Sequence, residues 1–220
     1  MTLKSWFYDH VASRYYDREL AEATEATRRR CLERLALSPG DTVLDLGCGT
    51  GLNQPFIAEA IGVDGSIIGV DASGGMLERA RSRAEEGGYA DRLQLIKGDA
   101  RRVNELVPVQ PDAVMTTLFF SVVPQWRQVF QRSFDLLKPG GRFLVMDTYW
   151  VERHSALIRV LLLKYAAKAA VPGFEPLKET CADFDMEDFP PDSELPFYIA
   201  TGTKATGTKA TGTREAATGL

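Results

Sequence analysis

Apolar and polar positions alternate in blocks along the middle of the chain, and these blocks predict strands and helices in turn. Short apolar runs, several of them rich in β-branched residues, predict strands over 42–46, 66–70, 93–97, 113–117 and 142–147. Segments with helical spacing predict helices over about 53–61, 75–86 and 124–137. Strands that alternate with helices indicate an α/β fold, in which a parallel sheet is covered by helices on both faces.

The segment before the first strand has two parts with different patterns. Residues 5–17, SWFYDHVASRYYD, are rich in aromatic side chains and predict either a segment packed on the core or a lid over a site. Residues 18–37 have helical spacing and predict a helix that covers one face of the sheet. Its inward stripe contains Leu20, Thr24, Cys31 and Leu35. The arginines fall largely off that stripe and favour a solvated face over a phosphate site: Arg28, Arg29, Arg30 and Arg34.

The segments after the fifth strand predict a cap, a hairpin and a tail. Residues 149–171 have apolar positions at helical spacing together with basic side chains, which suits a lid and also an anionic membrane surface. Short strands are predicted near 184–189 and over 195–201. The repeats TGTKA, TGTKA and TGTRE carry almost no large apolar side chain, so residues 203–220 are predicted to be disordered. The predicted division is therefore 1–41 as lid and covering helix, 42–202 as core with a cap helix at about 150–171, and 203–220 as tail.

Composition narrows the class of protein. The chain has 220 residues, of which 45% are hydrophobic and 25% are charged, as in a soluble globular domain. Its net charge of −4 argues against a nucleic-acid partner. The three cysteines are widely separated, which indicates neither a disulfide framework nor a metal site, and no apolar run approaches the ~20 residues of a membrane span. We expect a cytoplasmic protein, with membrane association through the basic helix as an added possibility.

The clearest chemical signal is residues 42–53, TVLDLGCGTGLN, where a predicted strand runs into three alternating glycines and then into a helix. Gly47, Gly49 and Gly51 let the backbone turn sharply and approach a ligand without a Cβ in the way. Pro55 falls in the first turn of the helix, so the free amides of the helix start can face an anionic group. The pattern predicts a site for a small molecule.

An acid at the end of the second strand strengthens this prediction. Asp71 lies about twenty residues after the last glycine, where a Rossmann-like unit places a carboxylate against ribose hydroxyls. The dinucleotide-binding fingerprint requires a glycine at the position of Leu52, so a nicotinamide cofactor is disfavoured. Other predicted strands also end at or near a polar residue, namely Asp45, Asp99 or Thr117. Ligands of such sheets bind beyond the carboxyl ends of the strands, so these side chains converge on one crevice.

Five segments, in order, resemble the motifs of the class I S-adenosylmethionine-dependent methyltransferases. They are the glycine motif, GVDASGGML at 69–77, GDA at 98–100, PDAVMTTLFFSVVP at 111–124 and LLKPGGRFLVMD at 136–147. The resemblance implies a Rossmann-like, doubly wound, mostly parallel sheet of about seven strands that ends in an antiparallel hairpin. It also implies S-adenosylmethionine as cofactor and S-adenosylhomocysteine as product.

The resemblance implies roles for individual residues. Asp45 lies near the cofactor's amino group, or else holds the glycine turn through backbone amides. Asp71 binds the ribose, Met76 contacts the adenine ring, and Asp99 accepts from the adenine amino group or else caps a turn. Cys48 is interpreted as a small buried residue and not as a nucleophile. The complete predicted cofactor-binding set is Asp45, Gly47, Cys48, Gly49, Gly51, Asn53, Asp71, Ala72, Met76, Asp99, Ala100 and Thr117, with no metal ligand.

The predicted function is methyl transfer to a small amphiphilic acceptor. The aromatic N-terminal segment, the apolar stretch 116–124 and the basic helix favour an amine of a phospholipid-like headgroup. A quinone ring carbon or a soluble metabolite is the alternative acceptor, and a non-catalytic adenosylmethionine-binding module is the alternative of another class. Stretch 116–124 lacks the Asn/Asp-Pro-Pro-Tyr/Phe loop of enzymes that methylate nucleobases, and Phe119, Phe120 and Trp126 suggest an apolar pocket. An amine needs no base, whereas a hydroxyl or carbon acid would; the candidate bases are Tyr15, Tyr16, Tyr149 and His154.

Overall fold

The computed structural model describes residues 13–148, 171–191 and 197–206, with side chains from residue 21 onward. Within these ranges seven strands form one sheet in the order β3-β2-β1-β4-β5-β7-β6. The strands are β1 (Thr42–Leu46), β2 (Ser66–Asp71), β3 (Leu93–Lys97), β4 (Ala113–Thr117), β5 (Arg142–Asp147), β6 (Asp185–Phe189) and β7 (Phe197–Thr203). The first five pair in parallel, and β7 pairs antiparallel with both β5 and β6. The predicted Rossmann-like sheet and its antiparallel C-terminal hairpin are confirmed.

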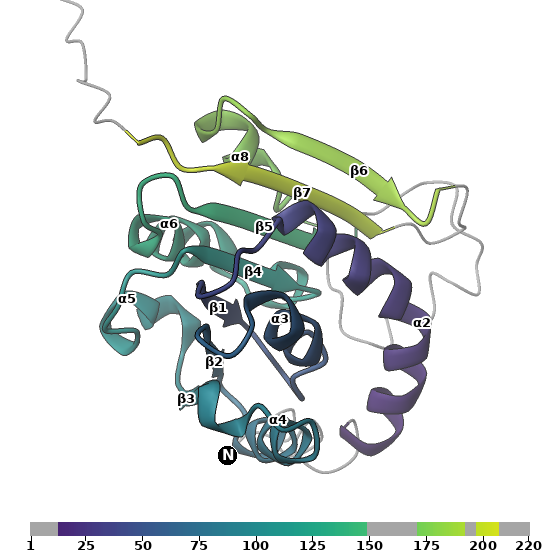
Figure 1. Cartoon of the computed structure of the whole chain (residues 1–220). Coiled ribbons are helices and arrows are strands. Elements are labelled where there is room, and N and C mark those ends of the chain that lie inside the picture. Colours follow the sequence, from purple (N-terminus) through teal and green to yellow (C-terminus); the bar gives the residue numbers. More distant parts are fainter. Residues whose placement is uncertain (1–12, 149–170, 192–196, 207–220) are drawn as a thin grey trace, which may run out of the picture.

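Helices cover both faces of this sheet, as Figure 1 shows. On one side lie α2 (Ser13–Leu35), α3 (Gln54–Ile61) and α4 (Gly74–Glu86). On the other side lie α5 (Val103–Leu106) and α6 (Trp126–Leu136), with α8 (Glu175–Thr180) beside β7. The short 3-10 turns are η2 (Ala90–Arg92), η3 (Ala100–Arg102) and η4 (Phe120–Val122). Because both faces of the sheet are buried, the sequences of the parallel strands are nearly continuous apolar runs.

Alternation along each strand decides which layer a side chain joins. In β1, Leu44 and Leu46 belong to the core shared with α5, α6 and α8, whereas Val43 belongs to the core shared with α2, α3 and α4. Because side chains alternate between faces, Asp45 lies on the same face as Val43. By the same spacing, Asp71 and Thr117 follow Ile67 and Met115 on that face. Three polar residues at strand ends therefore lie on the face covered by α2, α3 and α4.

Two predicted boundaries differ from the structure. Helix α2 begins at Ser13 and not at residue 18, so Tyr15 and Tyr16 lie within this helix and do not precede it. At the other end, β7 continues to Thr203, and the Lys204 ammonium donates to the carbonyls of Phe134, Asp135 and Leu137 at 3.0, 2.8 and 2.7 Å. The last carbonyls of a helix lack hydrogen-bond donors within the helix, and the Lys204 ammonium group provides donors for those of α6. Residues 203–206 were therefore wrongly assigned to the disordered tail.

Several predictions fall outside the described residues. These are the N-terminal half of the aromatic segment, the cap helix at 150–171 with Tyr149 and His154, and the tail beyond 206. Across the described ranges, no helix is long and apolar enough to cross a membrane. In the same ranges no group of three or more His, Cys, Asp or Glu side chains is arranged to hold a metal ion.

Candidate functional site

Strand order reverses between β1 and β4, and the glycine turn begins at the end of β1. The turn glycines Gly47, Gly49 and Gly51 have φ of +72°, +55° and +78°, a region that favours glycine. A Cβ on Gly47 would lie 2.2 Å from the Phe119 ring, so this glycine is needed for packing. A Cβ on Gly49 would meet no atom of the described residues within 4 Å. Gly49 therefore faces open space at the point where α/β sheets bind their ligands.

Asp71 holds this turn in place from the neighbouring strand. Its Oδ2 accepts a 2.9 Å hydrogen bond from the Gly49 amide, and its Oδ1 accepts one of 2.9 Å from the Ser73 amide. The turn is also bound by the Val70 carbonyl, which accepts from the amides of Gly47 and Cys48 at 2.8 and 3.1 Å. The role of holding the turn through a backbone amide, considered above for Asp45, is thus filled by Asp71.

Asp45 is fully buried and only partly satisfied. Its Oδ1 accepts a 2.9 Å hydrogen bond from the Asn53 side-chain amide, while its Oδ2 has no partner among the described residues. Burial raises the pKa of Asp45 to about 6, although the Asn53 hydrogen bond and the charge of Arg28 lower it. Gln54 lies close enough to lower this pKa as well, yet neither of its amide atoms makes a hydrogen bond of normal geometry. An orphaned buried carboxylate oxygen is costly unless something binds it.

Arg28 was missed by the sequence analysis and is the least expected member of the site. Its side chain is only 4% exposed, which overturns the prediction of a solvated face at this position. Its Nε donates to Thr24 at 2.9 Å, and its Nη1 donates to the Asn53 side-chain oxygen and, at 3.2 Å, to the Thr117 hydroxyl. Spacing could have found it, because positions 24, 28, 31 and 35 form one helical stripe. A charged side chain is expected at the surface, because its burial requires compensating partners. For Arg28 two of these partners, Asn53 and Thr117, come from segments distant in sequence.

The remaining predicted residues occupy different environments. Thr117 accepts from the Asn53 amide at 3.1 Å as well as from Arg28, which joins β4 to the polar cluster. Met76 lies in the first turn of α4 and is 8% exposed. Asp99 accepts from the Arg101 amide at 2.9 Å and pairs with its guanidinium, which holds the pKa of Asp99 below its usual range. Asp99 therefore caps the turn, which was one of its two predicted roles. The contact of Asp99 with adenine stays a prediction.

Three further predicted residues have side chains that are unlike polar ligand-binding groups, namely Cys48, Ala72 and Ala100. Cys48 is buried, and burial raises the pKa of its thiol well above the usual value, which agrees with a residue that is not a nucleophile. Ala72 and Ala100 directly follow Asp71 and Asp99 and have no polar side chain, so any ligand contact would use their backbone. All three cysteines, Cys31, Cys48 and Cys181, are free and buried.

The aromatic residues after β4 do not all line a pocket. Phe120 is fully buried, and its ring centroid lies 5.9 Å from that of Trp126 and 6.5 Å from that of Phe130. Phe120 is therefore a core residue, which corrects the prediction of a pocket wall. Phe119 is partly buried against the same core, with its ring centroid 6.1 Å from that of Phe120, and its ring also lies against Gly47. It follows a residue with an unusual backbone, Leu118 at φ +52°. Phe119 thus packs directly on the glycine turn.

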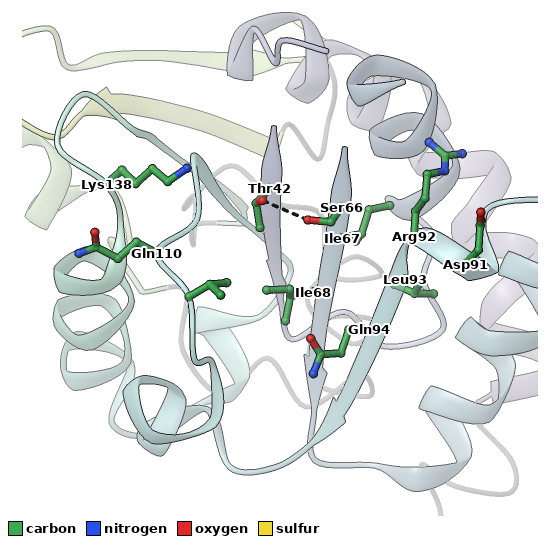
Figure 2. Close-up of a pocket in the computed structure, with 11 residues that line it drawn as sticks. Thr42, Ser66, Ile67, Ile68, Asp91, Arg92, Leu93, Gln94, Gln110 and Lys138 are labelled. Atoms are coloured by element: carbon green, nitrogen blue, oxygen red, sulfur yellow. Dashed lines mark hydrogen bonds between the residues drawn. The ribbon is translucent and has the colours of Figure 1, made fainter. Parts of the chain in front are cut away.

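A separate hollow of about 700 Å³ lies at the opposite end of the strands (Figure 2). It is lined by the first residues of β1 and β2, Thr42 and Ser66, whose hydroxyls are bonded to each other at 3.0 Å. Its cations are also engaged: Lys138 binds Asp112 at 2.7 Å, and Arg92 donates to backbone carbonyls. These four polar groups already have protein partners, in contrast to the buried Oδ2 of Asp45.

The geometry can be compared with known proteins. Residues 43–141 match the family described as a methyltransferase domain. Over 115 residues the chain is 33% identical to an arsenite methyltransferase of Halobacterium salinarum, covering 51% of this chain and 28% of that protein. Over 123 residues it is 30% identical to a demethylmenaquinone methyltransferase of Oceanobacillus iheyensis, covering 55% of this chain and 50% of that protein. The chain thus spans half or less of the length of these two curated relatives.

The fold is shared with solved methyltransferases as well. A phosphoethanolamine N-methyltransferase 2 of Haemonchus contortus, solved with S-adenosylhomocysteine, has a TM-score of 0.64 at 18% identity. The match covers 82% of this chain and 52% of that one. Together with the glycine turn and the strand order, these findings show that residues 43–141 form a methyltransferase domain of the class I S-adenosylmethionine-dependent type.

Proposed function

We propose that this chain transfers a methyl group from S-adenosylmethionine to a small amphiphilic acceptor. The observation that carries the proposal is the unpartnered Asp45 Oδ2, buried beside a glycine turn in which Gly49 faces open space. Asp45 and Asp71 are close enough for each charge to disfavour the other, since the charge of Asp71 raises the pKa of Asp45. A ligand with an ammonium group and a sulfonium would relieve both the missing contact and the repulsion.

The residues present fit this cofactor. Asp45 would hold the ammonium group and Asp71 the ribose hydroxyls, since each Asp71 oxygen can accept more than one hydrogen bond. Met76 would contact the adenine ring, with Asp99 as acceptor for its amino group. When bound, the cofactor supplies an already activated methyl group, so the protein mainly has to align the acceptor, which can contribute ~7–11 kcal/mol.

The acceptor that we propose first is an amine on a phospholipid-like headgroup. The basic and apolar segment 149–171 suits a lipophilic molecule with an anionic neighbour, and a neutral amine needs no catalytic base. The methyltransferases to which this chain is similar differ in their named acceptors, among them arsenite, demethylmenaquinone and phosphoethanolamine. A quinone carbon or a soluble metabolite is therefore the second candidate, and for it Tyr15, Tyr16, Tyr149 or His154 would serve as base.

Binding and turnover separate the competing functions. Titration of the purified full chain should show binding of S-adenosylmethionine and S-adenosylhomocysteine and no binding of NADH. Transfer of a labelled methyl group to a lipid extract distinguishes an enzyme from a non-catalytic binding module. Absence of S-adenosylhomocysteine binding would refute the proposal.

Vesicle binding tests the lipid acceptor separately. Anionic phospholipid vesicles should sediment the full chain, whereas neutral vesicles should not, because basic side chains near a membrane are attracted by its negative surface. A variant in which Arg153, Arg159, Lys164 and Lys168 are replaced by glutamine should lose this binding. Equal recovery with both vesicle types would count against the lipid acceptor and leave the methyltransferase proposal intact.

A further inference from the structure

We propose that Arg28 is a positioning residue that orients the Asn53 amide, so that Asp45 keeps one carboxylate oxygen for the ammonium group of the cofactor. The inference rests on the function proposed above and assigns a role to a helix that precedes the methyltransferase motifs. Its basis is a buried cluster formed by four segments that are distant in sequence. The members are Arg28 on α2, Asp45 on β1, Asn53 at the start of α3 and Thr117 at the end of β4.

The orientation of Asn53 follows from the kinds of atom that surround it. A guanidinium group can only donate hydrogen bonds, so Arg28 must take the oxygen of the Asn53 amide. The nitrogen of that amide then faces Asp45 Oδ1 at 2.9 Å and the Thr117 hydroxyl at 3.1 Å. Both hydrogens of the Asn53 amide are thereby used. With the amide reversed, its oxygen would face the Asp45 carboxylate and its nitrogen would face the guanidinium, and both contacts would be repulsive.

This arrangement leaves Asp45 half satisfied in a defined way. Asn53 binds Oδ1, whereas Oδ2 stays buried and without a partner among the described residues. Asn53 and Asp45 are both at most 1% exposed, so water has little access to either. Asn53 lies two residues after Gly51, and the charge of Asp45 acts on the Cys48 thiol in the turn, so the Asp45 carboxyl lies near the glycine turn. The available oxygen is therefore a consequence of the Arg28 contact.

Charge gives Arg28 a second effect on the same carboxyl. The groups that act on Asp45 are Arg28 from α2, Asp71 from β2, and Asn53 and Gln54 from α3. Cys48 in the turn and Tyr89 after α4 also sense its charge, and each has a raised pKa of its own. Among these groups Arg28 is the cation, and it opposes the effects of burial and of Asp71. Its loss should raise the pKa of Asp45 further and leave a neutral acid, which binds an ammonium group poorly.

The experiment compares two ligands in three proteins. S-adenosylhomocysteine and an analogue that lacks the α-amino group are titrated calorimetrically into the full chain, Arg28→Met and Arg29→Met. Arg29 is the matched control, because it is a neighbour on the same helix whose side chain is 56% exposed and pairs with Glu25. The wild type should prefer the amino ligand by about tenfold or more at a pH of about 7.5. This preference should fall as the pH drops through about 6, where Asp45 becomes protonated.

Arg28→Met should reduce the preference to about threefold or less, while Arg29→Met keeps the wild-type value. In Arg28→Met the pH at which the preference develops should rise by about one unit or more. A purely structural role for Arg28 would weaken both ligands alike and leave the preference and its pH profile unchanged. That result, in a folded variant, overturns the inference.

Arg28→Lys covers the case in which the methionine variant does not fold. Lysine keeps the charge but lacks the planar fork, so the pH profile should stay near that of the wild type while the preference falls. An unchanged preference in Arg28→Lys would overturn the orienting role. Carboxyl ¹³C NMR of Asp45 in ligand-free protein adds a readout that needs no cofactor binding. If the wild type bound no S-adenosylhomocysteine, the proposed function would fail, yet an unshifted Asp45 titration in the variants would still refute the effect of Arg28.

Discussion

The Gly49 amide donates a 2.9 Å hydrogen bond to the carboxylate of Asp71, so the acid that ends β2 holds the turn that follows β1. The two residues are separated by a strand, a helix and the turn itself, and the parallel pairing of β1 with β2 brings them together. The hydrogen bond fixes the part of the turn that faces open space. Asp71 thus has a structural role in addition to its proposed contact with ribose.

Replacement of Asp71 by alanine should therefore affect two properties. Loss of the proposed ribose contacts should weaken S-adenosylhomocysteine binding by on the order of 1–3 kcal/mol. Loss of the acceptor for the Gly49 amide should also lower the free energy of unfolding by about 1 kcal/mol. Calorimetric titration and urea denaturation measure the two effects. Asp91→Ala, in the exposed 3-10 turn that precedes β3 at the opposite end of the strands, is the control and should change neither. Unchanged affinity in Asp71→Ala would refute the ribose assignment.

The two turn glycines should respond differently to alanine. In Gly47→Ala the new Cβ would lie 2.2 Å from the Phe119 ring and the residue would keep a φ of +72°, so overpacking and backbone strain should together lower the free energy of unfolding by about 2–5 kcal/mol. In Gly49→Ala the positive φ of +55° should cost only about 1–2 kcal/mol, since no described atom is met.

The ligand affinities distinguish packing from binding at these positions. Gly49→Ala should lose more S-adenosylhomocysteine affinity than its modest change in stability suggests, because the added methyl group occupies the open side of the turn. Gly49→Asn provides a control for backbone strain, since asparagine tolerates a positive φ better than alanine does. If Gly49→Ala bound the ligand as tightly as the wild type, the open side of the turn would not be the binding surface.

Asp147 should give the stability a recognisable dependence on pH. This carboxylate at the end of β5 is buried and accepts from the amides of Ser121 and Thr148 at 3.0 and 2.8 Å. Burial raises its pKa to about 6, so the folded protein binds this proton more tightly than the unfolded chain does. As the pH rises from about 4 to about 6, Asp147 ionises in the unfolded chain but stays largely protonated in the folded protein, which favours unfolding. The contribution of Asp147 to stability therefore decreases over this interval.

Asp147→Asn isolates that contribution because asparagine stays neutral. Relative to the wild type, the variant should gain on the order of 1–3 kcal/mol in free energy of unfolding between about pH 4 and about pH 7. Urea denaturation at several pH values provides the difference curve. Using the difference removes the opposite effect of carboxyls such as Asp112 and Glu187, whose pKa values are lowered. Parallel curves for the two proteins would show that Asp147 does not titrate as described.

Lys204 should contribute to stability although it lies in the segment 203–220, which was predicted to be disordered. Its ammonium group donates to three carbonyls near the end of α6 and lies 5.7 Å from the centre of the Phe134 ring. Lys204→Met should lower the free energy of unfolding by about 0.5–2 kcal/mol. Lys209 occupies the same position of the next TGTKA repeat, and Lys209→Met is the matched control. Equal stabilities of the two variants would contradict the capping role.

The sheet was predictable because its signals are local. The predicted strands 113–117 and 142–147 have the same bounds as β4 and β5, since apolar runs with turn residues at their ends have few other ways to fold. The glycine turn was predictable for a similar reason, because alternating glycines with positive φ are recognisable from residue type alone. The start of α2 was placed too late, because aromatic residues such as Tyr15 and Tyr16 suit a lid and a helix equally well.

The sequence by itself determined the strand pattern, the glycine turn and the identity of the acids at the strand ends. Only the tertiary structure decided how these acids are used: Asp71 binds the turn, Asp99 pairs with Arg101, and Asp45 keeps an unpartnered oxygen. It alone also decided that Arg28 is buried. The reason is physical. Backbone periodicity depends on neighbouring residues, whereas a buried charge is tolerated only where partners from other segments surround it, and those partners meet only in the folded chain.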